Sequence, residues 1–429
     1  MRTTCLGVLG LGVLVAACSS SSSQSPAVVG DAGTDANVAV DAGPDVPEPP
    51  WSGTTVEANC KINGCIRELT KKTSYDAVTL GAAAAAGNPV DNGVTVYFIR
   101  YWSDGREVTG SVFVPDSPAP AGGYPVVLMN QFTTGLGAQC APSAGVLGLG
   151  VAGSTALRGF LTLVPDAPSY GGGTFGVFLA AKIAGRAALD GVRAAFHLGQ
   201  GLALTVARKA VIAGFSQGGH STMSAAAQLL GYAPHLEVRG FAAVAPPANF
   251  RSGINKVIQA NKGSGLFIPM RMLTWQQFFA FPGEPVFKEP YRTQAATWFA
   301  TECLFNANGK DGTLSSHFPD APADIFSDTY IQYGKNDTWP AEWAAVYEES
   351  TPIPRGVALP IVIYQGDMDT TVPKVDTDAY VKELTDAGLA VDYQIVAGAI
   401  HGTTAFSSFT VQQGANEAAV KWIRDRLAP

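Results

Sequence analysis

Short apolar runs alternate with longer amphipathic stretches over most of the chain. The first two runs are rich in β-branched residues, and Ser103-Asp104-Gly105 between them predicts a hairpin turn. The later runs are nearly continuous in Val, Ile, Leu and Ala, which is typical of strands buried on both faces. We therefore predict an α/β protein, in which a mostly parallel sheet carries helices on both faces and is opened by an antiparallel hairpin. The expected strands are 94–101, 107–114, 125–129, 160–164, 210–214, 240–244, 360–364 and 391–396, and the expected helices are 183–208, 216–230, 375–387 and 412–427.

Residues 247–351 break this alternation and are too many for a simple connection. We expect an inserted, partly helical cap there, which divides the core into residues 56–246 and 352–429. Large apolar side chains are dense in the insertion, and they can either bind an acyl chain or form the cap's own core. These side chains are Phe267, Met270, Met272, Trp275, Phe278, Phe279, Phe281, Phe287, Trp298, Phe299 and Phe305.

Residues 1–18 have the pattern of an export signal, with Arg2 followed by an apolar run too short for the roughly 20 residues that cross a bilayer. Val15-Ala16-Ala17-Cys18 resembles a bacterial lipobox, which implies a lipid on Cys18 and a place in the cell envelope. By the same resemblance to lipoproteins, Ser19 directly after the lipidated cysteine favours the outer membrane as the place where the protein is anchored. The alternative is an ordinary cleaved signal and a secreted protein. Residues 19–55, rich in Ser, Asp and Pro, predict a disordered tether.

The charge and the cysteines narrow the class of protein. The net charge of −7 has no basic patch beside it, which argues against a nucleic-acid partner.

Without Cys5 and Cys18, four cysteines remain in an exported chain, so disulfides are expected, with three possible connectivities. Cys60 and Cys65 are close enough to close a local loop, which would leave Cys140 for Cys303. Their spacing fits no zinc site, and we expect no metal.

One serine has the sequence context of a catalytic nucleophile. Gly214-Phe215-Ser216-Gln217-Gly218 follows an apolar strand and opens an Ala-rich helix, as a strained strand-to-helix turn requires. No other serine satisfies this pattern, although a glycine-rich turn with a passive serine is the simpler interpretation. A serine hydroxyl needs a base, and that base needs a carboxylate.

In proteins with such a turn, the chain order is serine, acid, histidine. His401 alone among the five histidines follows the last strand, and His220 lies too close to Ser216 in sequence. Asp369 and Asp367 compete as the acid after strand 360–364. We favour Asp369 from its position in the loop and expect Asp367 to bond turn amides.

A developing oxyanion needs two backbone donors. One is expected to be the amide of Gln217, at the start of the helix. The other should come from the loop after strand 125–129, where we assign Thr133, with Phe132 as the alternative.

These motifs together resemble the secretory lipase family of α/β-hydrolases, typified by large-capped fungal lipases and bacterial relatives. The resemblance implies the α/β-hydrolase fold, lipase or carboxylesterase activity without a cofactor, and a lid between the sixth and seventh strands. It places the catalytic roles on Ser216, Asp369 and His401 and a disulfide between Cys140 and Cys303. The likeness covers about residue 90 to the C-terminus, through GSVFVP (110–115), FTTG (132–135), CAPS (140–143), VPDAPSYG (164–171), LDGVRAA (189–195), GFSQGGH (214–220), VAPP (244–247) and GDMDTTVP (366–373).

One departure from the family concerns the oxyanion loop. Relatives often carry His-Gly before Thr-Thr-Gly, whereas this chain has Gln131-Phe132. We expect the change to affect the loop and the acyl pocket beside it, while the backbone donor survives.

The motifs predict a serine hydrolase that cleaves esters of hydrophobic acids through an acyl-enzyme. A peptidase or amidase using the same triad is a second interpretation. A non-catalytic surface lipoprotein is the third, although such a protein has no need of all three catalytic groups. The sequence does not indicate an oligomeric state.

Overall fold

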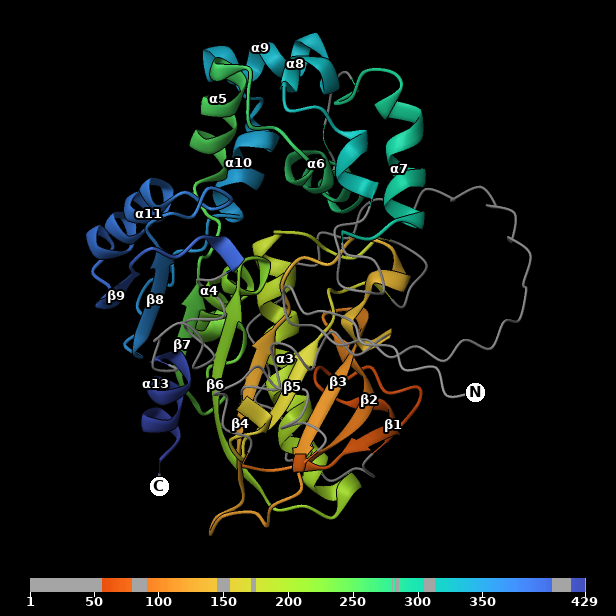
Figure 1. The fold of residues 1–429 in the computed structure, drawn as a ribbon, viewed down its shortest axis with the longest axis vertical. Helices are drawn as coiled ribbons and strands as arrows, with labels where there is room; N and C mark the ends of the chain where they lie inside the picture. The colour runs from red at the N-terminus through yellow and green to blue at the C-terminus, as the bar shows by residue number, and fades with distance from the viewer. Residues whose placement is uncertain are drawn as a thin grey trace, which may run out of the picture.

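A nine-stranded sheet forms the centre of the part of the chain that the computed structural model describes, which is residues 56–78, 91–144, 155–170, 175–279, 281, 285–304, 313–402 and 418–428 (Figure 1). The strand order is β1-β2-β3-β5-β4-β6-β7-β8-β9. The strands are β1 (Ile66–Tyr75), β2 (Val94–Ser103), β3 (Arg106–Pro115), β4 (Tyr124–Asn130), β5 (Leu161–Pro165), β6 (Val206–Phe215), β7 (Val238–Val244), β8 (Ile361–Gly366) and β9 (Val391–Val396).

The pairing follows the predicted pattern. From β5 across to β9 all neighbouring strands are parallel. At the other side β1, β2 and β3 pair antiparallel, and β3 is antiparallel to β5. Every residue of β5 and β8 is buried, as expected for strands covered on both faces. The predicted fold, a mostly parallel sheet opened by a hairpin, is confirmed.

Helices cover both faces of the sheet. Val126 and Leu128 of β4 share one hydrophobic cluster with α3 (Ala181–Leu202), α4 (Gln217–Tyr232) and α11 (Lys374–Asp386). Val127 and Met129 belong to a second cluster with α13 (Ala418–Leu427) on the opposite face. Alternate residues of one strand therefore enter separate cores, as the pleat requires. Residues 412–417 of the predicted last helix lie outside the described residues.

From the sequence, one strand was missed and one helix end was placed wrongly. Strand β1 was missed because its sequence IRELTKKTSY is rich in Lys and Thr and half exposed. Such a strand is tolerated at a sheet edge, where charged side chains also discourage further pairing. The helix predicted to reach residue 208 ends at Leu202, since Ala203 adopts the left-handed conformation and Val206 pairs with Tyr124 of β4.

The segment between β7 and β8 is mostly helical and lies at one end of the sheet (Figure 1). The missed β1 explains why these strands, predicted as sixth and seventh, are β7 and β8. Most of the segment's buried apolar side chains form a cluster of their own with residues of the loops that follow β4 and β5. Its helices are α5 (Phe250–Ala260), α6 (Phe267–Phe278), α7 (Tyr291–Thr301), η4 (Thr313–His317), α8 (Pro322–Ile325), α9 (Asp328–Asn336) and α10 (Ala341–Glu349).

The large apolar side chains of this segment divide by burial. Five of those singled out in the sequence, Met270, Met272, Trp275, Phe287 and Phe299, are buried in the segment's own cluster. Phe278, Phe279, Phe281 and Trp298 are partly buried against it, Phe267 is exposed, and Phe305 lies outside the described residues. Forming a core is therefore the main role of these side chains.

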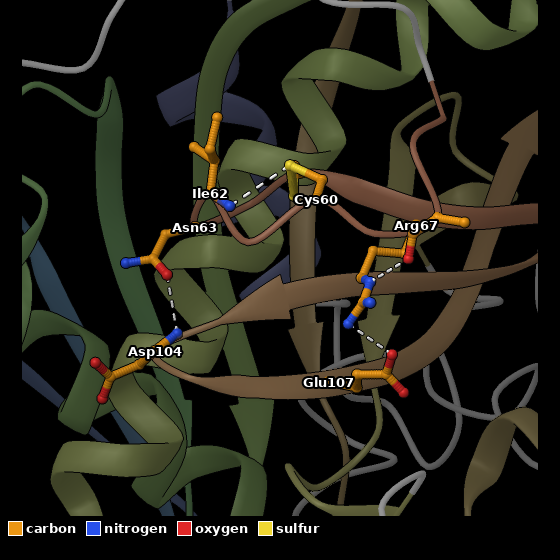
Figure 2. Close-up of a disulfide and its surroundings, with 8 residues drawn as sticks. Cys60, Ile62, Asn63, Arg67, Asp104 and Glu107 are labelled. Atoms are coloured by element: carbon orange, nitrogen blue, oxygen red, sulfur yellow. Dashed lines mark hydrogen bonds and ion pairs between the residues drawn. A yellow bond between two sulfur atoms is a disulfide. The ribbon is translucent and has the colours of Figure 1, made fainter. Parts of the chain in front are cut away.

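Two disulfides are present, Cys60–Cys65 and Cys140–Cys303. The first closes a short loop before β1, where Asn63 accepts a hydrogen bond from the amide of Asp104 at 3.0 Å (Figure 2). The second joins the 3-10 helix η1 (Ala138–Cys140) to the residues just after α7. Both predicted pairs are confirmed. Among the helices within the described ranges, none is long and apolar enough to span a membrane.

Candidate active site

Ser216 stands at the turn between β6 and α4 in a strained backbone conformation, with φ 56° and ψ −118°. The neighbouring glycines make this turn possible. A Cβ on Gly214 would lie 2.3 Å from the carbonyl oxygen of Gly218, and one on Gly218 would lie 2.2 Å from that of Asn130. On Gly219 it would lie 2.7 Å from the carbonyl oxygen of Val244. The glycines thus allow α4 to begin directly against the ends of β4 and β7.

His401 bridges Ser216 and Asp369. Its Nε2 lies 2.9 Å from Ser216 Oγ, and its Nδ1 lies 2.7 Å from Asp369 Oδ2. A carboxylate only accepts, so Nδ1 carries the proton and Nε2 is free to accept from the hydroxyl. The three side chains come from turns after β6, β8 and β9, which are far apart in sequence but end at the same edge of the parallel sheet.

The two competing aspartates have different partners. Asp369 is buried, and its Oδ1 accepts from the amides of Thr371 at 2.9 Å and Val372 at 2.8 Å. These two bonds orient the carboxylate so that Oδ2 reaches His401. Asp367 instead accepts from the amide of Gly398 at 2.7 Å. It therefore ties the turn after β8 to the loop that carries His401.

The other histidines that the structure shows in hydrogen bonds have other partners. His220 is fully buried, and its Nε2 donates to the carbonyl oxygen of Ser350 at 2.9 Å. Burial and, to a smaller extent, the nearby Arg271 lower the pKa of His220 to about 4, although the hydrogen bond to Ser350 opposes this shift. His317 contacts Glu302 at 2.8 Å. The ring of His401 packs 4.6 Å from that of Phe215, centroid to centroid.

The expected oxyanion donors lie on two elements that meet beside Ser216. Gln217 is the first residue of α4, and Thr133 lies in the buried loop after β4. Within the described part of the chain, neither amide has a hydrogen-bond acceptor. A backbone donor of an oxyanion must not already be bonded to another acceptor. The side chain of Gln217 donates to the carbonyl oxygen of Val177 at 3.3 Å, which ties the loop after β5 to α4.

Sequence reasoning assigned no role to two buried polar residues near the site, Asp166 and Tyr170. Asp166 accepts from Thr109 Oγ1 at 2.6 Å and from the amide and hydroxyl of Ser143. Burial raises the pKa of its carboxyl group, partly offset by these hydrogen bonds. Tyr170 Oη donates to the carbonyl oxygen of Gly135 at 2.5 Å. The sequence motifs that contain these residues and their partner Ser143, CAPS and VPDAPSYG, could have pointed to them, because the structure brings the two motifs together.

The segment of α5 to α10 is attached to the sheet domain close to this site. Trp275 of α6 donates from Nε1 to the carbonyl oxygen of Phe178 at 3.1 Å. Asn249 Nδ2 donates to the carbonyl oxygen of Asp376 at 3.1 Å. The Cys140–Cys303 disulfide adds a covalent link. Within the described ranges, no group of three or more His, Cys, Asp or Glu side chains could hold a metal ion.

The strand order, the strained serine turn and the order of the three side chains define an α/β-hydrolase fold. Comparison with known proteins agrees. Residues 153–272 match the model of the secretory lipase family. A trichothecene C-3 esterase from Fusarium sporotrichioides is 28% identical over 277 residues, which cover 62% of this chain and 57% of the esterase. The chain thus spans little more than half the length of this curated relative.

Solved structures show the same fold. The rice cell wall degrading esterase LipA from Xanthomonas oryzae superposes with a TM-score of 0.65 at 16% identity, covering 85% of this chain and 98% of LipA. Candida antarctica lipase A in its closed state gives a TM-score of 0.58 at 18% identity, covering 81% of this chain and 80% of the lipase. The predicted resemblance to secretory lipases and the predicted fold class are therefore confirmed.

Proposed function

We propose that this protein is a serine-dependent carboxylic-ester hydrolase that acts on hydrophobic acyl esters. The contact that carries the proposal is the chain of hydrogen bonds from Ser216 through His401 to Asp369. The family match and the two esterase relatives support ester bonds as the substrate class.

The reaction proceeds through an acyl-enzyme. Ser216 Oγ attacks the ester carbonyl carbon while His401 Nε2 takes its proton, and Asp369 stabilises the imidazolium. The amides of Gln217 and Thr133 hold the negative oxygen of the tetrahedral intermediate. As the intermediate collapses, His401 gives the proton to the leaving alcohol. A water molecule, deprotonated by His401, then attacks the acyl-enzyme and releases the acid and Ser216.

We assign residues 247–351 as the cap of this enzyme. Its attachments through Trp275 and Cys303 hold it over the edge of the sheet where the triad lies. The apolar side chains of the cap that are only partly buried, such as Phe278, Phe279 and Phe281, are the candidates for contact with an acyl chain.

A panel of soluble esters and matched amides tests the reaction class. We expect the purified domain to hydrolyse p-nitrophenyl esters and to favour acyl chains longer than acetate, with no turnover by a Ser216→Ala variant. A preference confined to acetate would contradict the hydrophobic substrate. Cleavage of anilides with no cleavage of esters would make the enzyme an amidase.

We further propose export and attachment to the cell envelope through lipid on Cys18. The two disulfides support an oxidising compartment. Residues 1–55 lie outside the described residues. Replacing Cys18 with Ala should move the protein from the membrane fraction to the soluble fraction, and its retention in membranes would refute the anchor.

A further inference from the structure

The loop of residues 131–136, which we call the oxyanion loop, is held at Thr134 and Gly135, one and two residues after Thr133. We propose that the Cys140–Cys303 disulfide and Tyr170 are positioning residues that hold the Thr133 amide where the oxyanion develops. This inference rests on the proposed ester hydrolysis, because it concerns the same site.

The disulfide lies directly against the oxyanion loop. Gly135 has a φ of 145°, and a Cβ there would lie 2.6 Å from Cys140 Sγ and 3.3 Å from Cys303 Cα. Next to the disulfide, the amide of Leu304 donates to the carbonyl oxygen of Thr134 at 2.9 Å. The disulfide thus brings the residues just after α7 against the loop and fixes them there.

Tyr170 holds the same loop through a different bond. Its ring is buried, and its Oη donates to the carbonyl oxygen of Gly135 at 2.5 Å. Burial raises the pKa of the phenol, so the hydroxyl keeps its proton and remains a donor at working pH. Tyr170 also packs closely on Gly176, where a Cβ would lie 2.5 Å from the ring. The ring therefore has little freedom to leave Gly135.

These contacts fall on Thr134 and Gly135, and none of them involves Ser216, His401 or Asp369. A donor stabilises an oxyanion only within a narrow range of distance, and a shift of about 1 Å can cost two orders of magnitude in rate. Loosening either contact should therefore weaken stabilisation of the tetrahedral intermediate while leaving ground-state binding of the ester unchanged. That combination lowers kcat without raising KM.

The test compares Tyr170→Phe, the Cys140→Ser/Cys303→Ser pair and the wild type. Removal of the Cys60–Cys65 disulfide by Cys60→Ser/Cys65→Ser is the matched control, since that disulfide contacts the loop before β1 instead. Each protein is assayed with one soluble ester. The affinities of a trifluoromethyl ketone, which forms a tetrahedral adduct with serine, and of the corresponding methyl ketone are then measured.

We expect both test variants to lose about tenfold or more in kcat, with KM within about twofold of wild type. The affinity for the trifluoromethyl ketone should fall by the same factor, whereas that for the methyl ketone should not change. The control pair should keep kcat and both affinities. If the Cys140→Ser/Cys303→Ser variant does not fold, the kinetics of Tyr170→Phe alone test the inference.

An unchanged kcat in folded Tyr170→Phe and in the folded cysteine pair would overturn the inference. Equal losses of affinity for both ketones would also overturn it, because they would indicate general damage to the site. Neither result affects the proposed function as long as the wild type hydrolyses esters. A wild type inactive on every ester would reject the proposed function, and the inference with it.

Discussion

Ser216 is held with a positive φ, which a residue with a Cβ adopts only at a cost of about 1–3 kcal/mol. The surrounding contacts outweigh that cost. The amide of Ser216 donates to the carbonyl oxygen of Val244 at 2.9 Å, and its own carbonyl accepts from the amide of His220 at 3.0 Å. In this strained backbone conformation the Ser216 hydroxyl points away from the edge of the sheet toward His401.

Asp369 contacts the catalytic histidine and Asp367 contacts a backbone amide, so replacing each with Asn should affect kcat unequally. Asp369→Asn should lower kcat by roughly 10⁴-fold, because an amide no longer fixes the imidazole tautomer or stabilises its cation. Asp367→Asn should stay within about tenfold of wild type, since Asn Oδ1 can still accept from the amide of Gly398. Steady-state kinetics on one ester would compare them. A near-wild-type Asp369→Asn would overturn the assignment of the acid.

His220 predicts a pH dependence of stability. Its folded pKa, about 4, lies below its ordinary value of 6.5, so the stabilisation is present above pH 6.5 and is lost as pH falls toward 4. His220→Gln keeps an N–H donor for Ser350 but does not titrate. Between pH 7.5 and 4.5 the wild type should lose about 2–3 kcal/mol more of its unfolding free energy than the variant does. Urea unfolding at both pH values measures it, and parallel losses would contradict the buried neutral imidazole.

Among single residues, Ser216 and Asp369 could be proposed because each follows a buried apolar strand, β6 or β8, whose end could be placed. His401 could be proposed from the chain order, since it follows the last strand, β9. Asp166 and Tyr170 also follow a strand, but nothing local distinguishes them from ordinary turn residues. Their partners, Ser143 and Gly135, come from another loop, and this pairing depends on the fold.

At the scale of elements, the start of α4 must approach the end of β4 closely. A Cβ at Gly218 would meet two backbone carbonyl oxygens, of Asn130 at 2.2 Å and of Gln131 at 2.7 Å. Backbone atoms cannot yield as a flexible side chain can. The helix and the oxyanion loop are therefore in contact only because this position has no side chain.

Gly218→Ala tests this contact against a control in the same helix. The added methyl group should separate α4 from β4, lower kcat by about 100-fold or more and destabilise the protein by about 1–3 kcal/mol. Gly231→Ala meets nothing within 4 Å and should stabilise the helix by about 0.5–1 kcal/mol with normal activity. Kinetics and denaturant unfolding measure both effects. Equal behaviour of the two variants would rule out the close approach.

The buried strands could be predicted from the sequence, whereas of the two edge strands only β9 was predicted and β1 was missed. Strands such as β5 and β8 are almost uniformly apolar because both faces are covered. Strand β1 at the sheet edge carries charged side chains and lacks that pattern. The end of α3 was missed because Val206 to Arg208 suit a helix locally, whereas pairing with β4 makes them a strand.

In the molecule as a whole, the proposed cap is joined to the sheet domain by particular hydrogen bonds. Trp275 and Trp343 are both buried in the cap's hydrophobic cluster. The indole N–H of Trp275 donates to the carbonyl oxygen of Phe178, outside the cap. The indole N–H of Trp343 has no acceptor among the described residues.

The two tryptophans allow the cap's attachment to be measured. Both Trp275→Phe and Trp343→Phe remove similar volume, but only the first leaves a carbonyl oxygen without its donor. We expect Trp275→Phe to be about 1–2 kcal/mol more destabilising than Trp343→Phe. Thermal or urea unfolding of the two variants gives the difference. A larger loss in Trp343→Phe would show that packing, and not the bond to Phe178, holds the cap.

The insertion itself was predictable, since more than a hundred residues cannot form a simple loop. The role of its aromatic side chains was not, because composition does not distinguish a core from a binding surface. Only the structure shows which side chains are buried together. The disulfide from Cys140 to Cys303 spans 163 residues, and spacing alone left its pairing open.

If His401 activates Ser216 as a nucleophile, an alkyl organophosphonate ester should react with that serine alone. We expect the folded wild type to gain one phosphonyl group on Ser216, identified by peptide mass. Ser216→Ala should gain none, and His401→Ala should react far more slowly. A folded wild type that stays unlabelled, or a Ser216→Ala variant labelled as fast as the wild type, would contradict this activation.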